Sequence, residues 1–249
     1  MTPDHAATVR ALMPQLRADL ETLVRIPSIS GDGRPDAPLQ AAHDEVVRLF
    51  RDAGVQTDTL HLPGTAPIVI GEIPAPPGAP TILLYSHYDV VPAGDEALWD
   101  SPPFEPTERD GALYGRGTAD TKANILAHVG ALRAWEGRPP VGIKLLIEGN
   151  EEIGGAALTA YPAEHPELFA CDAMIIGDAG SVRPGVPTLT VALRGMADVH
   201  VEVTTLASAK HSGLYGGAAP DALLTLISAL STLHDERGDV AVDGLLRTP

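Results

Sequence analysis

Residues 81–89 have the sequence TILLYSHYD, an apolar run that ends in a histidine and an aspartate. Such a run, preceded by the turn-forming residues PAPPGAP at 74–80, predicts a buried β-strand over 81–86. His87 then stands at the carboxyl end of this strand, and Asp89 follows two residues later. Because alternate residues of an extended segment point to the same side, the carboxylate of Asp89 can hold the imidazole N–H of His87.

The residues on either side of this stretch alternate between strand and helix patterns. Apolar runs predict further strands over 67–73, 141–147 and 173–176. Apolar residues at helical spacing predict helices over 6–23, 41–53, 122–135 and 156–161. Gly54 is placed to terminate the second helix. Strands that alternate with helices are typical of the α/β class, so we expect a mostly parallel sheet flanked by helices.

The pattern changes after Pro187, where a second domain is expected to begin. Two β segments are predicted near a turn at Gly195, over 188–193 and 199–204. An amphipathic helix is predicted next, over 219–234, and a short strand over 240–242. This change divides the chain into domains 1–186 and 187–249.

Composition excludes several classes of partner. The 249 residues carry 17 Lys and Arg against 33 Asp and Glu, a formal net charge of −16, and no stretch is basic enough to follow a phosphate backbone. We therefore expect no nucleic acid partner. Apolar runs are too short to span a membrane, and the amino-terminal residues lack the apolar core of a secretory signal. Cys171 is the single cysteine, which excludes an internal disulfide, and we expect a cytoplasmic protein.

Acidic residues follow the other predicted strands. Glu151 and Glu152 come after the strand over 141–147, Asp178 comes after the strand over 173–176, and Asp120 precedes the helix over 122–135. The carboxyl ends of parallel strands face one crevice, so these side chains are expected to meet there with the histidine. Carboxylates repel one another at short range, and a divalent cation relieves that repulsion. Imidazole nitrogen and carboxylate oxygen suit zinc, with manganese or cobalt as alternatives.

Each of these signals has an ordinary explanation when taken alone. A histidine at a strand end is more often a surface or core residue than a metal ligand. A Glu-Glu pair is usually solvated, and an aspartate near a helix start is usually a cap. The occurrence of such residues at successive strand ends favours a metal site over these alternatives.

Five segments of the chain together resemble the dinuclear zinc exopeptidases, a family that includes cytosolic non-specific dipeptidases, carnosinases, acetylornithine deacetylases and succinyl-diaminopimelate desuccinylases. The segments are SHYDVVP at 86–92, WDSPPFEPTERDGALYGRGTADTKAN at 99–124, EGNEEIGG at 148–155, GDAG at 177–180 and KHSGLYGGAAPDAL at 210–223. Their combination is most similar to the dipeptidase branch. The resemblance implies that 1–186 is the amino-terminal part of a metallopeptidase catalytic domain. It implies that 187–249 begins a lid and dimerisation domain.

The resemblance also implies roles for individual residues. Two divalent metal ions, zinc or alternatively manganese or cobalt, would be held by His87, Asp120, Glu152 and Asp178. Asp120 would bridge both metals, and the peptide bond that follows it would be cis. Glu151 would be the general base and Asp89 would orient His87.

The lid domain contributes one further candidate, His211. By resemblance it reaches the scissile carbonyl, often across a dimer interface, and stabilises the developing oxyanion. The alternative is a surface histidine that caps the loop before the helix over 219–234. The resemblance thus implies a homodimer formed through the second domain of the complete protein.

The expected activity is metal-dependent hydrolysis of the amide bond of dipeptides or short peptides, through a water shared by the metals. An aspartate at the position of Asp178 is associated with dipeptidases and aminopeptidases in this family. Two alternatives stay open, namely an N-acyl amino acid deacylase and a catalytically inactive metal-binding or dimerisation module. Family members are longer and bring one more metal-binding histidine, so we expect this chain to bind a first metal more tightly than a second and to hydrolyse dipeptides weakly or not at all.

Overall fold

The computed structural model describes residues 4–31, 37–183, 185–196 and 198–245. The chain forms two compact units, Met1–Thr190 and Val191–Pro249, which are considered separately. No helix within the described ranges combines the length and the apolar character needed to cross a membrane.

The first unit is built on a five-stranded sheet with the order β1-β2-β6-β3-β7. Its strands are β1 (Gln56–Leu60), β2 (Ile68–Ile73), β3 (Thr81–His87), β6 (Gly142–Glu148) and β7 (Ala173–Ile176). β3 runs parallel to both β6 and β7, whereas β1, β2 and β6 are antiparallel neighbours. The α/β class is therefore confirmed, with a mixed sheet whose parallel part surrounds β3.

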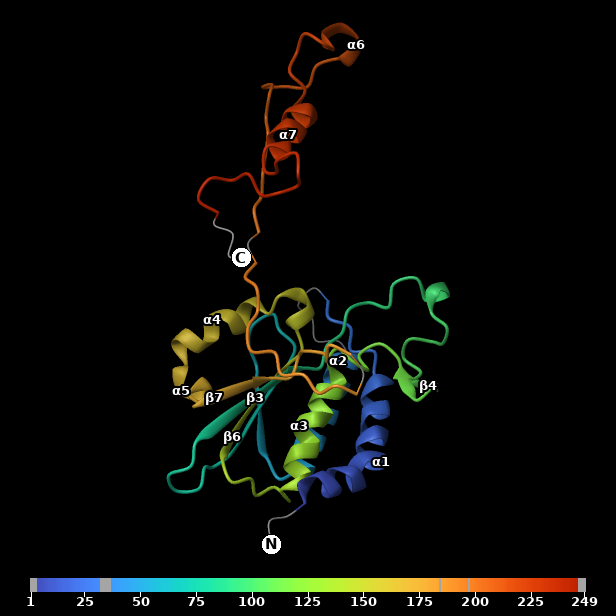
Figure 1. Cartoon of the computed structure of the whole chain (residues 1–249), viewed down its shortest axis with the longest axis vertical. Coiled ribbons are helices and arrows are strands. Elements are labelled where there is room, and N and C mark those ends of the chain that lie inside the picture. The colour runs from blue at the N-terminus through green and yellow to red at the C-terminus, as the bar shows by residue number, and fades with distance from the viewer. Residues whose placement is uncertain (1–3, 32–36, 184, 197, 246–249) are drawn as a thin grey trace. The chain divides into compact units, whose positions relative to one another are not determined.

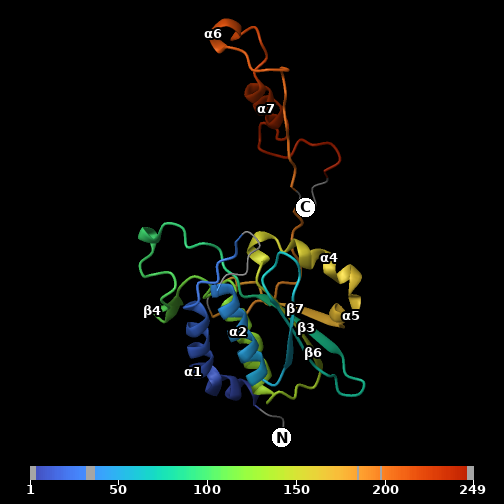
Figure 2. The same cartoon turned by 180° about the vertical axis from the view of Figure 1, so that it is seen from behind.

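Helices cover both faces of this sheet (Figures 1 and 2). On one face, α1 (His5–Val24), α2 (Ala37–Asp52) and α3 (Lys122–Ala134) contribute to the main core. On the other face, α4 (Ala156–Glu164) and α5 (Pro166–Phe169) pack through Leu158 and Phe169 against a smaller apolar cluster. Successive residues of β3 point to opposite faces of the sheet. Leu84 accordingly belongs to the first cluster and Leu83 to the second.

A buried carboxylate joins the three helices of the first face. Asp19 on α1 pairs with Arg48 on α2 at 3.2 Å and with Arg133 on α3 at 2.7 Å. Its side chain is only 6% exposed, so water contributes little to its solvation. The two guanidinium groups therefore supply the charge and hydrogen bonds that a buried carboxylate requires.

Helix α2 ends where the sequence predicts. Gly54 lies two residues after Asp52, the last residue of α2, and has φ +91°, a left-handed conformation that L side chains rarely adopt. A Cβ at this position would also lie 2.9 Å from the Cα of Gly137, so the two chain segments approach too closely for any side chain.

Several elements were not expected from the sequence. They include β1, the short helix α5, the hairpin of β4 (Thr107–Arg109) and β5 (Ala112–Tyr114), and the short 3₁₀ helices η1 (Glu96–Leu98) and η2 (Glu151–Ile153). The unexpected strands are short, and β1 (QTDTL) and β4 (TER) consist mainly of polar residues. Their existence depends on partner strands rather than on a local apolar run.

The second unit contains α6 (Ser212–Tyr215) and α7 (Ala222–Ser231), and here two sequence predictions are wrong. The described residues of 188–193 and 199–204 form no strands, because nothing pairs with them and alternation alone does not make a strand. Val191 and Val199 are accordingly 87% and 80% exposed. The predicted strand over 240–242 is reduced to one bridge between Val240 and His234.

The predicted helix over 219–234 is shorter than expected. The carboxylate of Asp221 accepts the N–H of Leu224 at 2.9 Å, which caps α7 and places its first residue at Ala222. At the other end, α7 stops at Ser231 rather than continuing to His234.

Candidate metal centre

The candidate residues of the first unit gather at the carboxyl ends of the parallel strands. His87 is the last residue of β3 and pairs in register with Glu148, the last residue of β6. The chain leaving β6 forms η2, which carries Glu151 and Glu152. Asp178 follows β7 on the other side of β3. The parallel alignment of three strands thus brings separate stretches of sequence to one edge of the sheet.

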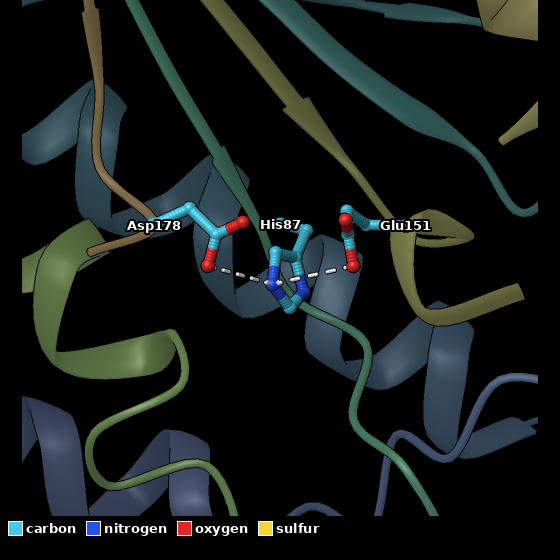
Figure 3. A group of neighbouring side chains, drawn as sticks. All are labelled: His87, Glu151 and Asp178. Carbon is cyan, nitrogen blue, oxygen red and sulfur yellow. Dashed lines mark ion pairs between the residues drawn. The ribbon is translucent and has the colours of Figure 1, made fainter. Parts of the chain in front are cut away.

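The Nε2 atom of His87 faces three carboxylates. It lies 3.2 Å from Oδ1 of Asp120, 3.5 Å from Oδ1 of Asp178 and 3.9 Å from Oε2 of Glu151. Figure 3 shows the imidazole between Asp178 and Glu151. The His87 side chain is 1% exposed, and its Nε2 atom has no hydrogen-bond partner of suitable geometry among the described residues. This buried ring nitrogen thus faces a group of oxygen atoms but makes no hydrogen bond.

The other ring nitrogen contacts Asp89. Nδ1 of His87 lies 3.0 Å from the main-chain oxygen of Asp89 and 3.3 Å from its carboxylate. A carbonyl oxygen can only accept, so Nδ1 carries the hydrogen, and neutral His87 has its lone pair on Nε2. Asp89 therefore lies where the sequence predicts, beside the imidazole.

Asp89 also holds the turn that carries the two glutamates. Its carboxylate oxygens accept the N–H of Glu151 at 3.3 Å and the N–H of Glu152 at 3.2 Å. The Asp89 side chain is fully buried, so these contacts are shielded from water. One carboxylate consequently links the histidine on β3 to the η2 turn after β6.

The electrostatics of this edge favour a bound cation. Burial acts to lower the pKa of His87, but the nearby carboxylates of Asp178 and Asp89 raise this pKa to about 11. Burial raises the pKa of Glu151, and Asp178, Asp89 and Asp120 raise it further against the opposing effect of His87. Burial and the charge of Asp120 likewise raise the pKa of Glu152. A proton or a metal ion is therefore needed to balance the carboxylates.

Among the residues that the structure describes, two groups of side chains have the composition of a metal site. Nitrogen or oxygen atoms within 4.8 Å of one another come from His87, Glu151 and Asp178 in one group and from His87, Asp120 and Glu152 in the other. Both groups combine imidazole with carboxylates, which suits zinc, manganese or cobalt. Together with the unpartnered Nε2 atom of His87, this donor set fits a divalent cation. One glutamate belongs to each group, so the groups do not distinguish a metal ligand from a general base. The assignment of Glu152 as ligand and Glu151 as base stays a prediction.

Asp120 lies on the loop before α3. Its side chain is 69% exposed, and the peptide bond between Asp120 and Thr121 is cis, as the family resemblance implies. Lys122, the first residue of α3, is fully buried and donates to the main-chain oxygens of Leu23 at 2.9 Å and Ile26 at 2.8 Å. Burial lowers the pKa of Lys122 to about 7 against the charge of Asp89. The lysine therefore anchors the start of α3 to the end of α1.

His211 lies in the second unit, where it caps α6. Its Nδ1 atom accepts the N–H of Gly213 at 3.1 Å, and the residue is exposed. This is a helix cap, though on α6 rather than on the loop before the longer helix. A role for His211 at the metal centre stays a prediction.

The sequence reasoning missed a partly buried pair next to the site. The hydroxyl of Tyr85 donates to Oε1 of Glu148 at 2.7 Å. Burial raises the pKa of both groups. A pocket beside this pair is lined by Tyr85, Glu148, Glu151, Gly154, Gly155 and Leu158. The available signal was a glutamate at the end of a mostly apolar strand, GIKLLIE.

In a comparison with known protein families, the model described as peptidase family M20/M25/M40 matches residues 83–242. Among curated proteins, the cysteinylglycine-S-conjugate dipeptidase of Corynebacterium striatum is 49% identical over 170 residues, covering 67% of this chain and 37% of the relative. The Cys-Gly metallodipeptidase dug1 of Schizosaccharomyces pombe is 31% identical, covering 91% and 51%. The Beta-Ala-His dipeptidase of Rattus norvegicus is 30% identical, covering 98% and 55%.

Solved structures show the same fold. The M20 family metallo-carboxypeptidase Sso-CP2 from Sulfolobus solfataricus matches with a TM-score of 0.73 and 27% identity, covering 92% of this chain and 52% of that structure. Human carnosine dipeptidase 1 matches with a TM-score of 0.68 and 25% identity, covering 95% and 53%. The chain spans about half, or less, of the length of the relatives it matches.

Proposed function

Because the chain belongs to peptidase family M20/M25/M40, we propose that it carries the metal-binding part of a dipeptidase that hydrolyses the amide bond of dipeptides or short peptides. The observation that carries this proposal is the convergence of Asp120, Asp178 and Glu151 on the unpartnered Nε2 atom of His87. The dipeptidase names of the curated relatives support this substrate class.

We assign the metal ligands as the family resemblance implies. His87, Asp120 and Asp178 would hold a first divalent ion, and Asp120 and Glu152 would contribute to a second. Zinc is the expected metal, with manganese and cobalt as alternatives. When bound, such ions lower the pKa of a water molecule and polarise a carbonyl group.

The protein residues of this site have separate tasks in the reaction. Asp89 accepts the Nδ1 hydrogen of His87 and so keeps the Nε2 lone pair directed into the site. Glu151 takes a proton from the attacking water and later donates it to the leaving amine. Its raised pKa suits this exchange, because a base must hold the proton before passing it on.

We further propose that the second unit belongs to a lid and dimerisation domain. In this proposal His211 leaves its capping position and stabilises the oxyanion at the site of a partner chain. A substrate with a free amino group is favoured by the presence of aspartate, rather than glutamate, at position 178.

Metal titration together with paired hydrolysis assays tests the proposal. Calorimetry with zinc or manganese should show one ion bound more tightly than a second, since the first has three protein ligands and the second has two. His87→Ala should abolish the tight site, and Glu151→Gln should leave metal binding close to that of the unsubstituted chain. Hydrolysis of a dipeptide should be weak and should exceed that of an N-acyl amino acid.

Three outcomes would contradict parts of this proposal. Absence of metal binding by the unsubstituted chain would refute the metal centre. Preference for the N-acyl amino acid would identify a deacylase instead. Two equally tight sites with rapid dipeptide turnover would show that another residue or a partner chain completes the second site.

A further inference from the structure

The main-chain oxygen of Gly177 accepts hydrogen bonds from two hydroxyl groups on different elements. Ser86, on β3, donates through Oγ at 2.7 Å, and Thr121, just before α3, donates through Oγ1 at 2.7 Å. The N–H of Gly177 donates in turn to the main-chain oxygen of Tyr85 at 2.7 Å. We call Ser86, Thr121 and Gly177 together the Gly177 junction.

Each member of the Gly177 junction is a sequence neighbour of a residue in the metal centre. Ser86 directly precedes His87, Thr121 directly follows Asp120, and Gly177 directly precedes Asp178. The three segments come from β3, from the start of α3 and from the end of β7. One carbonyl oxygen thus connects the three stretches of chain that carry a candidate ligand set.

The junction is buried and closely packed. Ser86 and Thr121 are both 0% exposed. Asn124 donates to Oγ1 of Thr121 at 2.8 Å, which leaves the hydroxyl hydrogen of Thr121 for Gly177. A Cβ at Gly177 would lie 2.5 Å from Nε2 of His128 and 2.6 Å from Oγ of Ser86, so only glycine permits this approach.

The side chains of Asp120 and Asp178 are too exposed for packing alone to fix their positions. The side chain of Asp120 is 69% exposed and that of Asp178 is 29% exposed. Two carboxylates facing one imidazole also repel each other until a cation binds between them. The hydrogen bonds of the neighbouring residues Ser86 and Thr121 to Gly177 therefore limit how far apart these side chains can move.

We propose that Ser86 and Thr121 are positioning residues, which set the spacing of His87, Asp120 and Asp178 through their shared acceptor on Gly177. The inference rests on the proposed function to the extent that these three side chains hold a metal.

Two donors on one acceptor predict non-additive effects. Removing one hydroxyl leaves the carbonyl of Gly177 with the other, whereas removing both leaves a buried carbonyl without a side-chain donor. Neighbouring residues that share a partner are expected to couple in this way in a double-mutant cycle.

The test compares Ser86→Ala, Thr121→Val and the double variant with the unsubstituted chain. Thr118→Val is the matched control, because the Thr118 hydroxyl lies on the same loop but donates to Gly115 at 2.8 Å. Thermal unfolding midpoints are measured without metal, and Co²⁺ affinity and absorption spectra are measured by titration. We expect the double variant to lose more thermal stability than the sum of the single variants. We also expect it to bind Co²⁺ about tenfold or more weakly, with an altered spectrum.

Thr121→Ser should restore the Co²⁺ spectrum, and Thr118→Val should leave it unchanged. Additive midpoints together with an unchanged Co²⁺ spectrum would overturn the proposal. If the double variant does not fold, an unchanged spectrum in Thr121→Val would overturn it. If the unsubstituted chain binds no Co²⁺, the proposed metal centre is refuted, and the midpoints alone decide the junction, with additivity overturning it.

Discussion

Substituting Asp89 with asparagine should weaken metal binding although Asp89 is not itself a proposed ligand. The carboxylate contacts Nδ1 of His87 at 3.3 Å and accepts two main-chain hydrogen bonds from the η2 turn, at 3.3 Å from Glu151 and 3.2 Å from Glu152. Asparagine keeps the size of this side chain but replaces one oxygen by an NH₂ group. It also removes a buried negative charge beside the imidazole.

The magnitude follows from these contacts. Loss of a carboxylate that supports a metal-binding histidine typically weakens metal affinity by about 10–100-fold, or about 1.4–2.7 kcal/mol. The new NH₂ group must face the N–H of either Glu151 or Glu152, and a buried donor without an acceptor costs about 1–3 kcal/mol. This second effect displaces the turn that carries both glutamates. We therefore expect Asp89→Asn to fall near the upper end of the range, at about 100-fold.

Calorimetric titration with zinc measures this loss, and Asp100→Asn is the matched control. Asp100 has a 90% exposed side chain, so its substitution removes the same charge without a buried contact. In the metal-free protein, the pKa of His87 measured by NMR should also decrease, because the hydrogen bond and charge of Asp89 raise it. An affinity loss in Asp89→Asn no larger than that in Asp100→Asn would refute the reasoning.

Three further predictions concern stability, pH and turnover. Asp19→Ala should reduce the free energy of unfolding by about 3–5 kcal/mol, because it removes the carboxylate that pairs with Arg48 and Arg133, and denaturant unfolding that shows no loss would contradict this. Protonated His87 should stabilise the metal-free fold, because its pKa is raised in the folded state. This contribution to the free energy of unfolding should be complete below about pH 6.5 and should disappear as the pH rises toward about 11. Zinc affinity should increase over the same range because zinc displaces the His87 proton, and a pH-independent affinity in calorimetry would contradict the assignment. His211→Ala, made in a full-length enzyme that contains this chain, should lower turnover without changing metal content, whereas loss of metal would make His211 a ligand.

Elements with strong local signals could be predicted from the sequence alone. The strand over 173–176 and the start of the helix at Lys122 agree with β7 and α3. Gly54 lies just beyond the end of α2, because glycine, having no Cβ, adopts the positive φ found there without steric cost. Such signals depend on neighbours in sequence, and they are therefore present before any tertiary contact forms.

Elements that depend on a partner could not be predicted in this way. β1 has the polar sequence QTDTL and exists because it pairs with β2. The residues over 188–193 and 199–204 have strand-like alternation and nevertheless form no strands in their described parts, since nothing pairs with them. Strand formation is decided by cross-strand contacts more than by intrinsic preference.

The sequence by itself determined the chemistry of the site and the strands that carry it. A histidine, an aspartate two residues later and acidic residues after successive strands imply one meeting point, because parallel strands end at the same edge. Their number and type were sufficient to expect a metal. The family motifs added the expected roles of Glu151 and Asp120.

Only the tertiary structure decided how these residues are held. The double contact of Asp89 with His87 and the η2 turn depends on the pairing of β3 with β6. The meeting of Ser86 and Thr121 on Gly177 depends on how β3, α3 and β7 pack together. Ser86 and Thr121 are 91 and 56 residues away from Gly177 in the sequence, and each donates to it at 2.7 Å. Such hydrogen bonds follow from the folded positions of whole elements, which no local sequence pattern encodes.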